Sequence, residues 1–155
     1  MLGARRVVAR APARSAIAPA MSSTADPSPR LCQYVVLRRD LARAPHSWPV
    51  GALSAQTAHA CVAAIWTYRD RAETMAYCDA ANIASMRKVV LEAKTEAQLR
   101  ALSETLTAAG VEHALWLEQP ENVATCLATR PYEKEVVGGY FKKYNLAKDV
   151  FSAPT

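Results

Sequence analysis

The sequence predicts a single α/β domain in which a four-stranded mixed sheet carries helices on both of its faces. Four short, largely apolar runs have the pattern of strands, the first of them rich in β-branched residues, and helical patterns occur between them. Such alternation is typical of a sheet with helices packed against it. The length of 155 residues and a hydrophobic share of 51% suit one domain with its own core.

The first half of the predicted domain, which opens at Cys32, contains one strand and two helices. The strand is 33–37, QYVVL, followed by a proline-containing loop over 38–50. An alanine-rich pattern predicts a long helix over 51–70, and a second, shorter helix follows over 73–82.

The second half contains three strands and two helices. The strands are predicted at 87–93, 112–117 and 123–129, and the last helix at 132–144. Between the first two of these strands, three leucines repeat at helical spacing within 95–109. Thr95 can cap this helix and Gly110 can end it.

The termini differ from the domain in composition. Residues 1–31 carry five arginines and one aspartate, which is typical of a disordered basic extension or a mitochondrial transit peptide. We expect a cytoplasmic protein, or a mitochondrial one if residues 1–30 act as a transit peptide; initiation at Met21 is an alternative. The domain is expected over 32–146, with a flexible tail over 147–155.

The net charge of +5 belongs mostly to that extension, because the remaining chain carries 14 basic and 13 acidic residues. The domain would therefore bind RNA through local clusters of charge. No apolar run is long enough to cross a membrane, so we expect no membrane insertion. The sequence has no glycine-rich phosphate loop, nucleophile elbow or metal-ligand cluster.

Residues that could carry chemistry occur early in the long helix. Ala52, Gln56, His59 and Ala63 share one helical face, close to backbone N–H groups that favour anions. Such a face could hold a phosphate or a developing oxyanion, with His59 as proton carrier. The alternative is a solvated Gln56 and a His59 that is hydrogen-bonded against the sheet.

Further candidates follow two strands. Glu118 comes after the third strand, where it could orient a histidine or a water, or simply be a solvated turn residue. Arg38 and Asp40 leave the end of the first strand, where ligands of open α/β sheets bind. Arg38 could bind phosphate with Asp40 holding it, or the two could form an exposed charge pair.

Several segments resemble the type 2, archaeal and eukaryotic, peptidyl-tRNA hydrolase family. They are 34–41 (YVVLRRDL), 51–60 (GALSAQTAHA), 87–91 (RKVVL) and 115–126 (LWLEQPENVATC). The second is similar to the family's first helix, with its Ala-Gln and Ala-His pairs, and the fourth takes the place of the loop Asp-x-Gly-x-Thr. The similarity is greatest to a divergent eukaryotic branch.

The resemblance implies hydrolysis of the ester between a peptide and tRNA, which recycles tRNA, without metal or organic cofactor. It implies that Gln56, His59 and Glu118 are catalytic, Glu118 in place of the family's aspartate. Arg38, Asp40 and Asn122 are the implied substrate-binding residues, and the arrangement predicts one cleft lined by Ala52, Gln56, His59, Arg38 and Glu118. The implied partner is peptidyl-tRNA, with a protein partner as a further possibility.

Two departures from the family pattern bear on activity. The family's lysine after the helix glycine is Ala52, and Pro120, Glu121 and Asn122 replace the glycine- and threonine-bearing loop. Loss of a charge-assisted contact of roughly 1.5–3 kcal/mol predicts weak activity. The alternative is a non-catalytic member of the fold that binds tRNA ends or a protein.

Overall fold

The computed structural model describes residues 30–148. The predicted N-terminal extension, apart from its last two residues, and positions 149–155 lie outside the described residues. The strands are β1 (Leu31–Arg38), β2 (Arg87–Ala93), β3 (His113–Glu118), β4 (Val123–Thr129), β5 (Tyr132–Glu133) and β6 (Asn145–Leu146). The helices are α1 (Val50–Thr67), α2 (Ala72–Cys78), α3 (Glu96–Ala108) and α4 (Lys134–Phe141), with 3-10 turns η1 (Asp40–Ala42) and η2 (Ile83–Ser85).

The sheet is mixed and has the order β3-β4-β1-β2-β6, with β5 paired to β1 outside this path. β1 is parallel to β2 and antiparallel to β4, which confirms the mixed sheet. The prediction of four strands was wrong, because β5 and β6 complete the sheet with two residues each. Two residues are too few to show the alternation of a strand, and such a short strand forms only by pairing with a longer one. The residues of β5 were therefore predicted as the start of the last helix.

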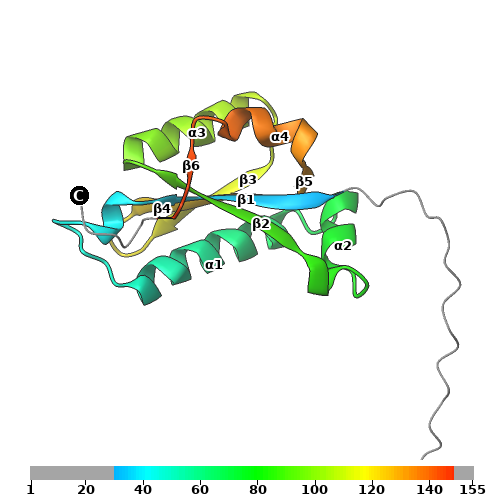
Figure 1. Ribbon diagram of the computed structural model, residues 1–155, viewed down its shortest axis with the longest axis horizontal. Helices are drawn as coiled ribbons and strands as arrows, with labels where there is room; N and C mark the ends of the chain where they lie inside the picture. Colours follow the sequence, from blue (N-terminus) through cyan, green and yellow to red (C-terminus); the bar gives the residue numbers. More distant parts are fainter. Residues whose placement is uncertain (1–29, 149–155) are drawn as a thin grey trace, which may run out of the picture.

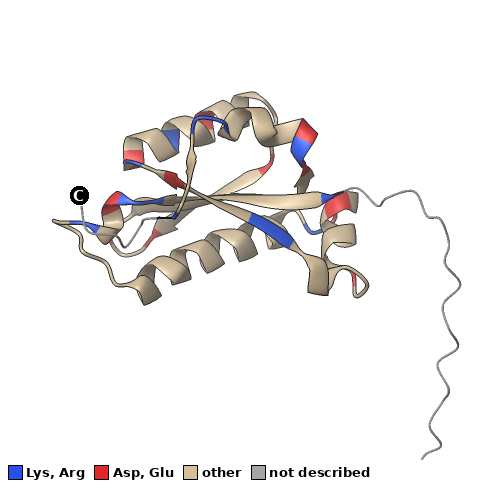
Figure 2. Cartoon of the chain, in the orientation of Figure 1, with Lys and Arg blue, Asp and Glu red and all other residues tan. Residues whose placement is uncertain are grey.

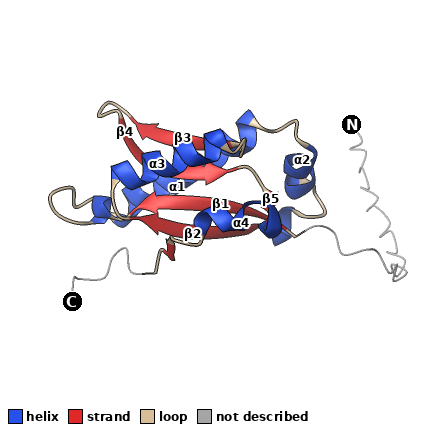
Figure 3. Cartoon of the chain, turned by 90° about the horizontal axis from the view of Figure 1, so that it is seen from above, coloured by secondary structure: helices blue, strands red, loops and turns tan. Residues whose placement is uncertain are grey.

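Helices cover both faces of this sheet, as predicted: α1 packs on one face, and α3 and α4 pack on the other (Figures 1 and 3). Successive side chains of a strand point to opposite faces. Thus Val35 and Leu37 of β1 join the core on the α1 side, whereas Tyr34 and Val36 join the core on the side of α3 and α4. β1 is therefore buried from both sides at the centre of the molecule.

Local interactions explain where the helices end. Thr95 accepts a hydrogen bond from the Gln98 N–H at the start of α3, and Gly110, with φ of 68°, follows its end, which confirms both predicted caps. The predicted second helix is shorter than expected, because the Asp79 side chain accepts the N–H of Ala81 and turns the chain after Cys78. No helix within residues 30–148 has the length and apolarity to span a membrane.

Candidate functional site

Helix α1 begins beside the C-terminal end of β1, to which η1 and a short loop connect it. The extended residue Pro49 precedes its first turn, which contains no acidic residue. The positive end of the helix dipole is therefore not neutralised by a side chain of that turn. Ala52, one turn before Gln56, is half-buried, and Gln56 itself is only 3% exposed.

A β-bulge in β4 fixes the Gln56 amide. Trp116 pairs with Cys126, but Leu117 pairs with Ala124, so Thr125 is an extra residue in β4. The bulge lets Thr125 face α1, where its hydroxyl donates a 2.7 Å hydrogen bond to Oε1 of Gln56. Since Oε1 is the acceptor of this bond, the amide NH₂ of Gln56 remains able to donate.

His59 and Glu118 are connected through Trp116 of β3. The His59 ring stacks on the Trp116 indole at 4.6 Å between ring centroids, with 16° between the planes. The Trp116 Nε1–H donates a 2.7 Å hydrogen bond to Oε2 of Glu118. His59 is exposed and Glu118 is half-buried, so both reach solvent.

Gln56, His59 and Glu118 thus lie toward one face and one end of the sheet. Gln56 is bonded to the bulge of β4, and Glu118 pairs with Val123 two residues before that bulge. Gln56 is buried, which reverses the alternative in which it was solvated. His59 packs against the sheet, as that alternative had it, but by stacking on Trp116. Within residues 30–148, no group of three or more His, Cys, Asp or Glu residues could hold a metal ion.

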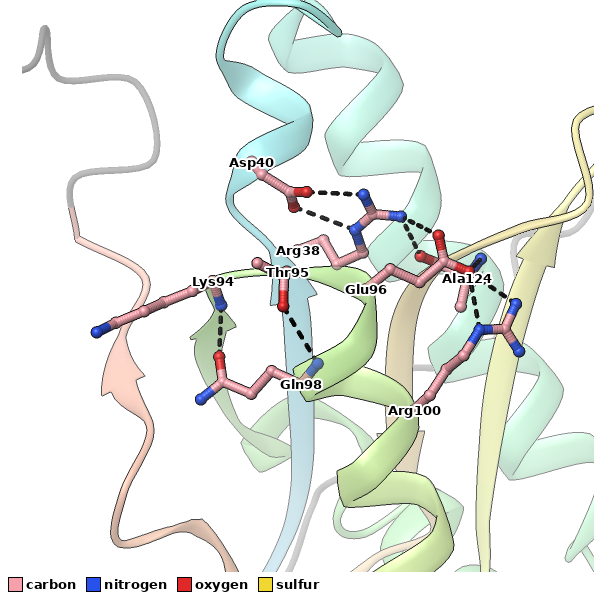
Figure 4. A network of polar contacts seen from close by, with 8 residues as sticks. All are labelled: Arg38, Asp40, Lys94, Thr95, Glu96, Gln98, Arg100 and Ala124. Carbon is pink, nitrogen blue, oxygen red and sulfur yellow. Dashed lines mark hydrogen bonds and ion pairs between the residues drawn. The ribbon is translucent and has the colours of Figure 1, made fainter.

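Arg38 does not join this group, because its side chain points to the opposite face of the sheet. Figure 4 shows its guanidinium between Asp40 and Glu96 of α3. It makes a bidentate pair with Asp40 at 2.7 and 3.1 Å, and Nη1 donates to Glu96 and to the Ala124 carbonyl at 2.9 and 2.8 Å. The Arg38 side chain is 5% exposed, so its guanidinium is engaged inside the fold.

Glu96 is the second centre of this network. Its Oε1 accepts from the Ala124 N–H and from Arg100. Burial raises the pKa of Glu96. The hydrogen bonds from Ala124 and Arg100 and the positive charge of Arg38 lower the pKa by more than burial raises it, so it lies below its ordinary value. The network holds the start of α3 against β1 and β4.

Asn122 stands in the loop between β3 and β4. It is exposed, has a left-handed backbone with φ of 55°, and its Oδ1 accepts a 3.3 Å hydrogen bond from Nε2 of Gln119. Asparagine tolerates this conformation better than most residues. Asn122 therefore shapes the turn beside Glu118, and its side-chain amide remains accessible.

Sequence reasoning did not identify Thr125 and Trp116 as residues of this site. Thr125 lies within an apolar strand, and its direction depends on a bulge that arises only when β3 and β4 pair. Trp116 and Glu118 are two residues apart in a strand, so their side chains lie on the same face of the sheet, and the hydrogen bond between them follows from that spacing. The signal for Trp116 was therefore in the sequence, and that for Thr125 was not.

Comparisons with known proteins agree with the resemblance. Residues 31–147 match the family described as "Peptidyl-tRNA hydrolase PTH2". Two proteins, each named "Putative peptidyl-tRNA hydrolase PTRHD1", are similar over 118 residues, which are 76% of this chain and 83% of each relative. The protein from Homo sapiens is 57% identical and that from Mus musculus is 55% identical.

The fold also resembles that of a solved structure, a protein of unknown function, Atu0240, from Agrobacterium tumefaciens strain C58. It has a TM-score of 0.51 and 16% sequence identity, and the match covers 76% of this chain and 97% of that one. This likeness shows the fold alone. The family match and the two relatives show that the chain belongs to the PTH2 family of peptidyl-tRNA hydrolases.

Proposed function

We propose that the protein hydrolyses the ester that joins a peptide to the terminal ribose of tRNA. Family membership supplies the reaction class. The observation that carries the proposal is the buried Gln56 amide, which the Thr125 hydroxyl fixes near the start of α1. A pre-oriented amide donor can stabilise charge that develops on the ester carbonyl oxygen.

In this mechanism the NH₂ of Gln56 donates to the carbonyl oxygen of the ester. The N-terminal end of α1, with no acidic residue in its first turn, favours the same negative charge. The Thr125 hydroxyl keeps the Gln56 amide in one orientation, so little reorganisation accompanies the transition state.

His59 accepts the proton of the attacking water, and Glu118 orients that water. The stack on Trp116 restrains the His59 ring, and the Trp116 indole N–H holds one oxygen of Glu118, which leaves the other available. The water oxygen forms a bond to the carbonyl carbon, and the bond from that carbon to the ribose oxygen breaks. The proton held by His59 then passes to the ribose oxygen.

The test is release of free tRNA from a purified peptidyl-tRNA at fixed salt. We expect slow turnover by the natural protein and roughly tenfold faster turnover by Ala52→Lys, the ratio that corresponds to 1.4 kcal/mol. Position 52 lies four residues before Gln56 on the same helical face, so a cation there would favour both the phosphates and the oxyanion.

The matched control is Gln56→Ala, which should lower turnover in both backgrounds. Folding of each variant is checked by its thermal transition. If neither the natural protein nor Ala52→Lys releases tRNA while both are folded, the hydrolase proposal is rejected.

The second candidate is a non-catalytic module that binds a protein partner. It is favoured by α1, which has no Asp, Glu, Lys or Arg over its 18 residues (Figure 2) and exposes Val62 and Trp66 by 66% and 68%. A helix that is apolar on its outer face often covers or contacts another surface. Such a module would tolerate Gln56→Ala but lose partner binding on Val62→Asp.

A further inference from the structure

A large basic groove lies on the sheet face opposite α1. It has a volume of about 1350 Å³ and runs between α4 and the N-terminal halves of β1 and β2. Its floor includes Tyr34 and Leu91, and α4 faces it with Gly138 and Gly139. A β-carbon on Gly138 would come within 3.6 Å of the Tyr34 hydroxyl, so the missing side chain keeps this part of the groove open.

Four exposed basic residues line the groove, against the single acidic residue Glu135. They are Arg30, Arg87, Lys134 and Lys142. The basic positions of β2 and of the start of α4 are blue in Figure 2. These four make no ion pair with any carboxylate of residues 30–148. Lys88 also borders the groove, but strand alternation turns its side chain to the other face of the sheet, where Nζ donates to the Tyr77 hydroxyl.

The cations of the groove differ from most other arginines of the domain in having no carboxylate partner among the described residues. The arginines at positions 38, 39, 71, 100 and 130 are paired with carboxylates. The groove instead collects cations whose charge is not neutralised locally, although residues from 32 onward carry nearly balanced charge. Like charges that converge without partners repel one another, and an anionic ligand relieves that repulsion.

The aromatic rings at the groove point to contact with phosphates. Tyr34 and Phe141 stack on one another at 4.6 Å and are 6% and 3% exposed, so neither offers a free face to a base. Burial raises the pKa of Tyr34, which keeps its hydroxyl protonated and able to donate. Contacts to the backbone alone carry no sequence information, which suits a protein that accepts tRNAs of different sequence.

We propose that this groove binds the sugar-phosphate backbone of the tRNA part of the substrate. The identity of the polyanion rests on the proposed function. The groove and the candidate site lie at opposite ends of β1 and on opposite faces of the sheet. The eight residues of β1 span roughly 26 Å at about 3.3 Å each, so a tRNA backbone that reaches both must cover at least that length and pass around the sheet.

The test compares two triple variants that lose the same charge. Arg87→Gln, Lys134→Gln and Lys142→Gln remove groove cations, and Arg69→Gln, Lys94→Gln and Lys148→Gln remove exposed cations elsewhere. Binding of deacylated tRNA is measured by fluorescence anisotropy across a salt series. We expect the groove variant to weaken binding by about tenfold or more at low salt and to lower the slope of log affinity against log salt by about 2.

Peptidyl-tRNA turnover separates this proposal from the hydrolase proposal. The groove variant should raise KM and keep kcat, whereas Gln56→Ala should lower kcat and leave tRNA binding unchanged. Groove-dependent tRNA binding without turnover would support the groove and reject the hydrolase. The groove proposal is overturned if the natural protein does not bind tRNA, or if both triple variants bind it equally. It is also overturned if a polyglutamate peptide of matched charge binds the groove more tightly than tRNA.

Discussion

One hydroxyl group determines how the Gln56 amide is presented. Gln56 and Thr125 are 3% and 0% exposed, so water cannot replace their 2.7 Å hydrogen bond without a change in packing. An amide carries a donor end and an acceptor end of nearly the same shape, and an oxyanion distinguishes between them. In the proposed mechanism, Thr125 therefore acts through Gln56 as a positioning residue.

Thr125→Val replaces this hydroxyl with a methyl group of similar size. We expect kcat for peptidyl-tRNA to fall by roughly tenfold, with KM unchanged, because the Gln56 amide is no longer held in one orientation. Stability should fall by about 1–2 kcal/mol, since Oε1 of Gln56 loses its partner in a buried place.

The control is Thr125→Ser, which retains the hydroxyl and should retain most of kcat. Steady-state kinetics and urea unfolding measure the two effects. A valine variant that is folded and turns over at the natural rate would show that Thr125 has no part in catalysis.

Helical spacing was sufficient to identify Gln56 and His59 as neighbours, because residues three apart share one helical face. It could not decide which of them is buried, since that depends on where β3 and β4 cross α1. Arg38 illustrates the same limit. The sequence placed it at the correct end of the sheet, but strand alternation turns it away from Gln56 and toward α3.

At the scale of elements, the Arg38 network fastens the first turn of α3 to the sheet. Figure 4 shows carboxylates from η1 and α3 meeting one guanidinium, while the backbone of β4 contributes its N–H and C=O at Ala124. These bonds use four of the five N–H donors of Arg38, and its side chain is buried, so it is poorly placed to bind a phosphate. Its removal would leave the carboxylate of Glu96 partly buried with one cation fewer.

This network predicts how stability depends on pH. Because the pKa of Glu96 is lowered in the folded protein, its stabilising effect is complete above its ordinary value of 4.5 and is lost as the pH falls through the lower, folded value. Glu112, held by Arg71 and Arg130, has a lowered pKa and acts in the same direction. The free energy of unfolding should therefore decrease as the pH is lowered from 4.5.

Glu96→Gln should reduce stability at neutral pH and should show a smaller further loss in acid. Glu104→Gln, on the exposed side of α3, is the matched control and should keep the natural pH profile. Urea unfolding at a series of pH values gives both slopes. If Glu96→Gln loses stability in acid as steeply as the natural protein, another group controls the acid transition.

At the scale of the whole molecule, the two proposals concern opposite faces of the sheet. The α1 side carries the polar residues proposed for chemistry, and the α4 side carries the groove whose cations have no carboxylate partner within residues 30–148. The order of the long elements was predictable, because each has its own hydrophobic period. The groove was not, because its cations come from segments some 50 residues apart that only the parallel pairing and α4 bring together.

Residues 1–30 provide the last prediction. Their composition of alanine, arginine, serine and proline offers little apolar surface to offset the entropy of ordering, so folding should not depend on them. We expect deletion of residues 1–30 to leave the melting temperature within error, and a large drop would mean that this segment packs on the domain. Arg30 lines the groove, so Arg30→Gln in the full chain should weaken tRNA binding slightly, while Lys94→Gln, which also removes one cation, should not. We further propose that the segment, fused to a reporter, directs it to mitochondria; a reporter that stays in the cytosol would exclude a transit peptide.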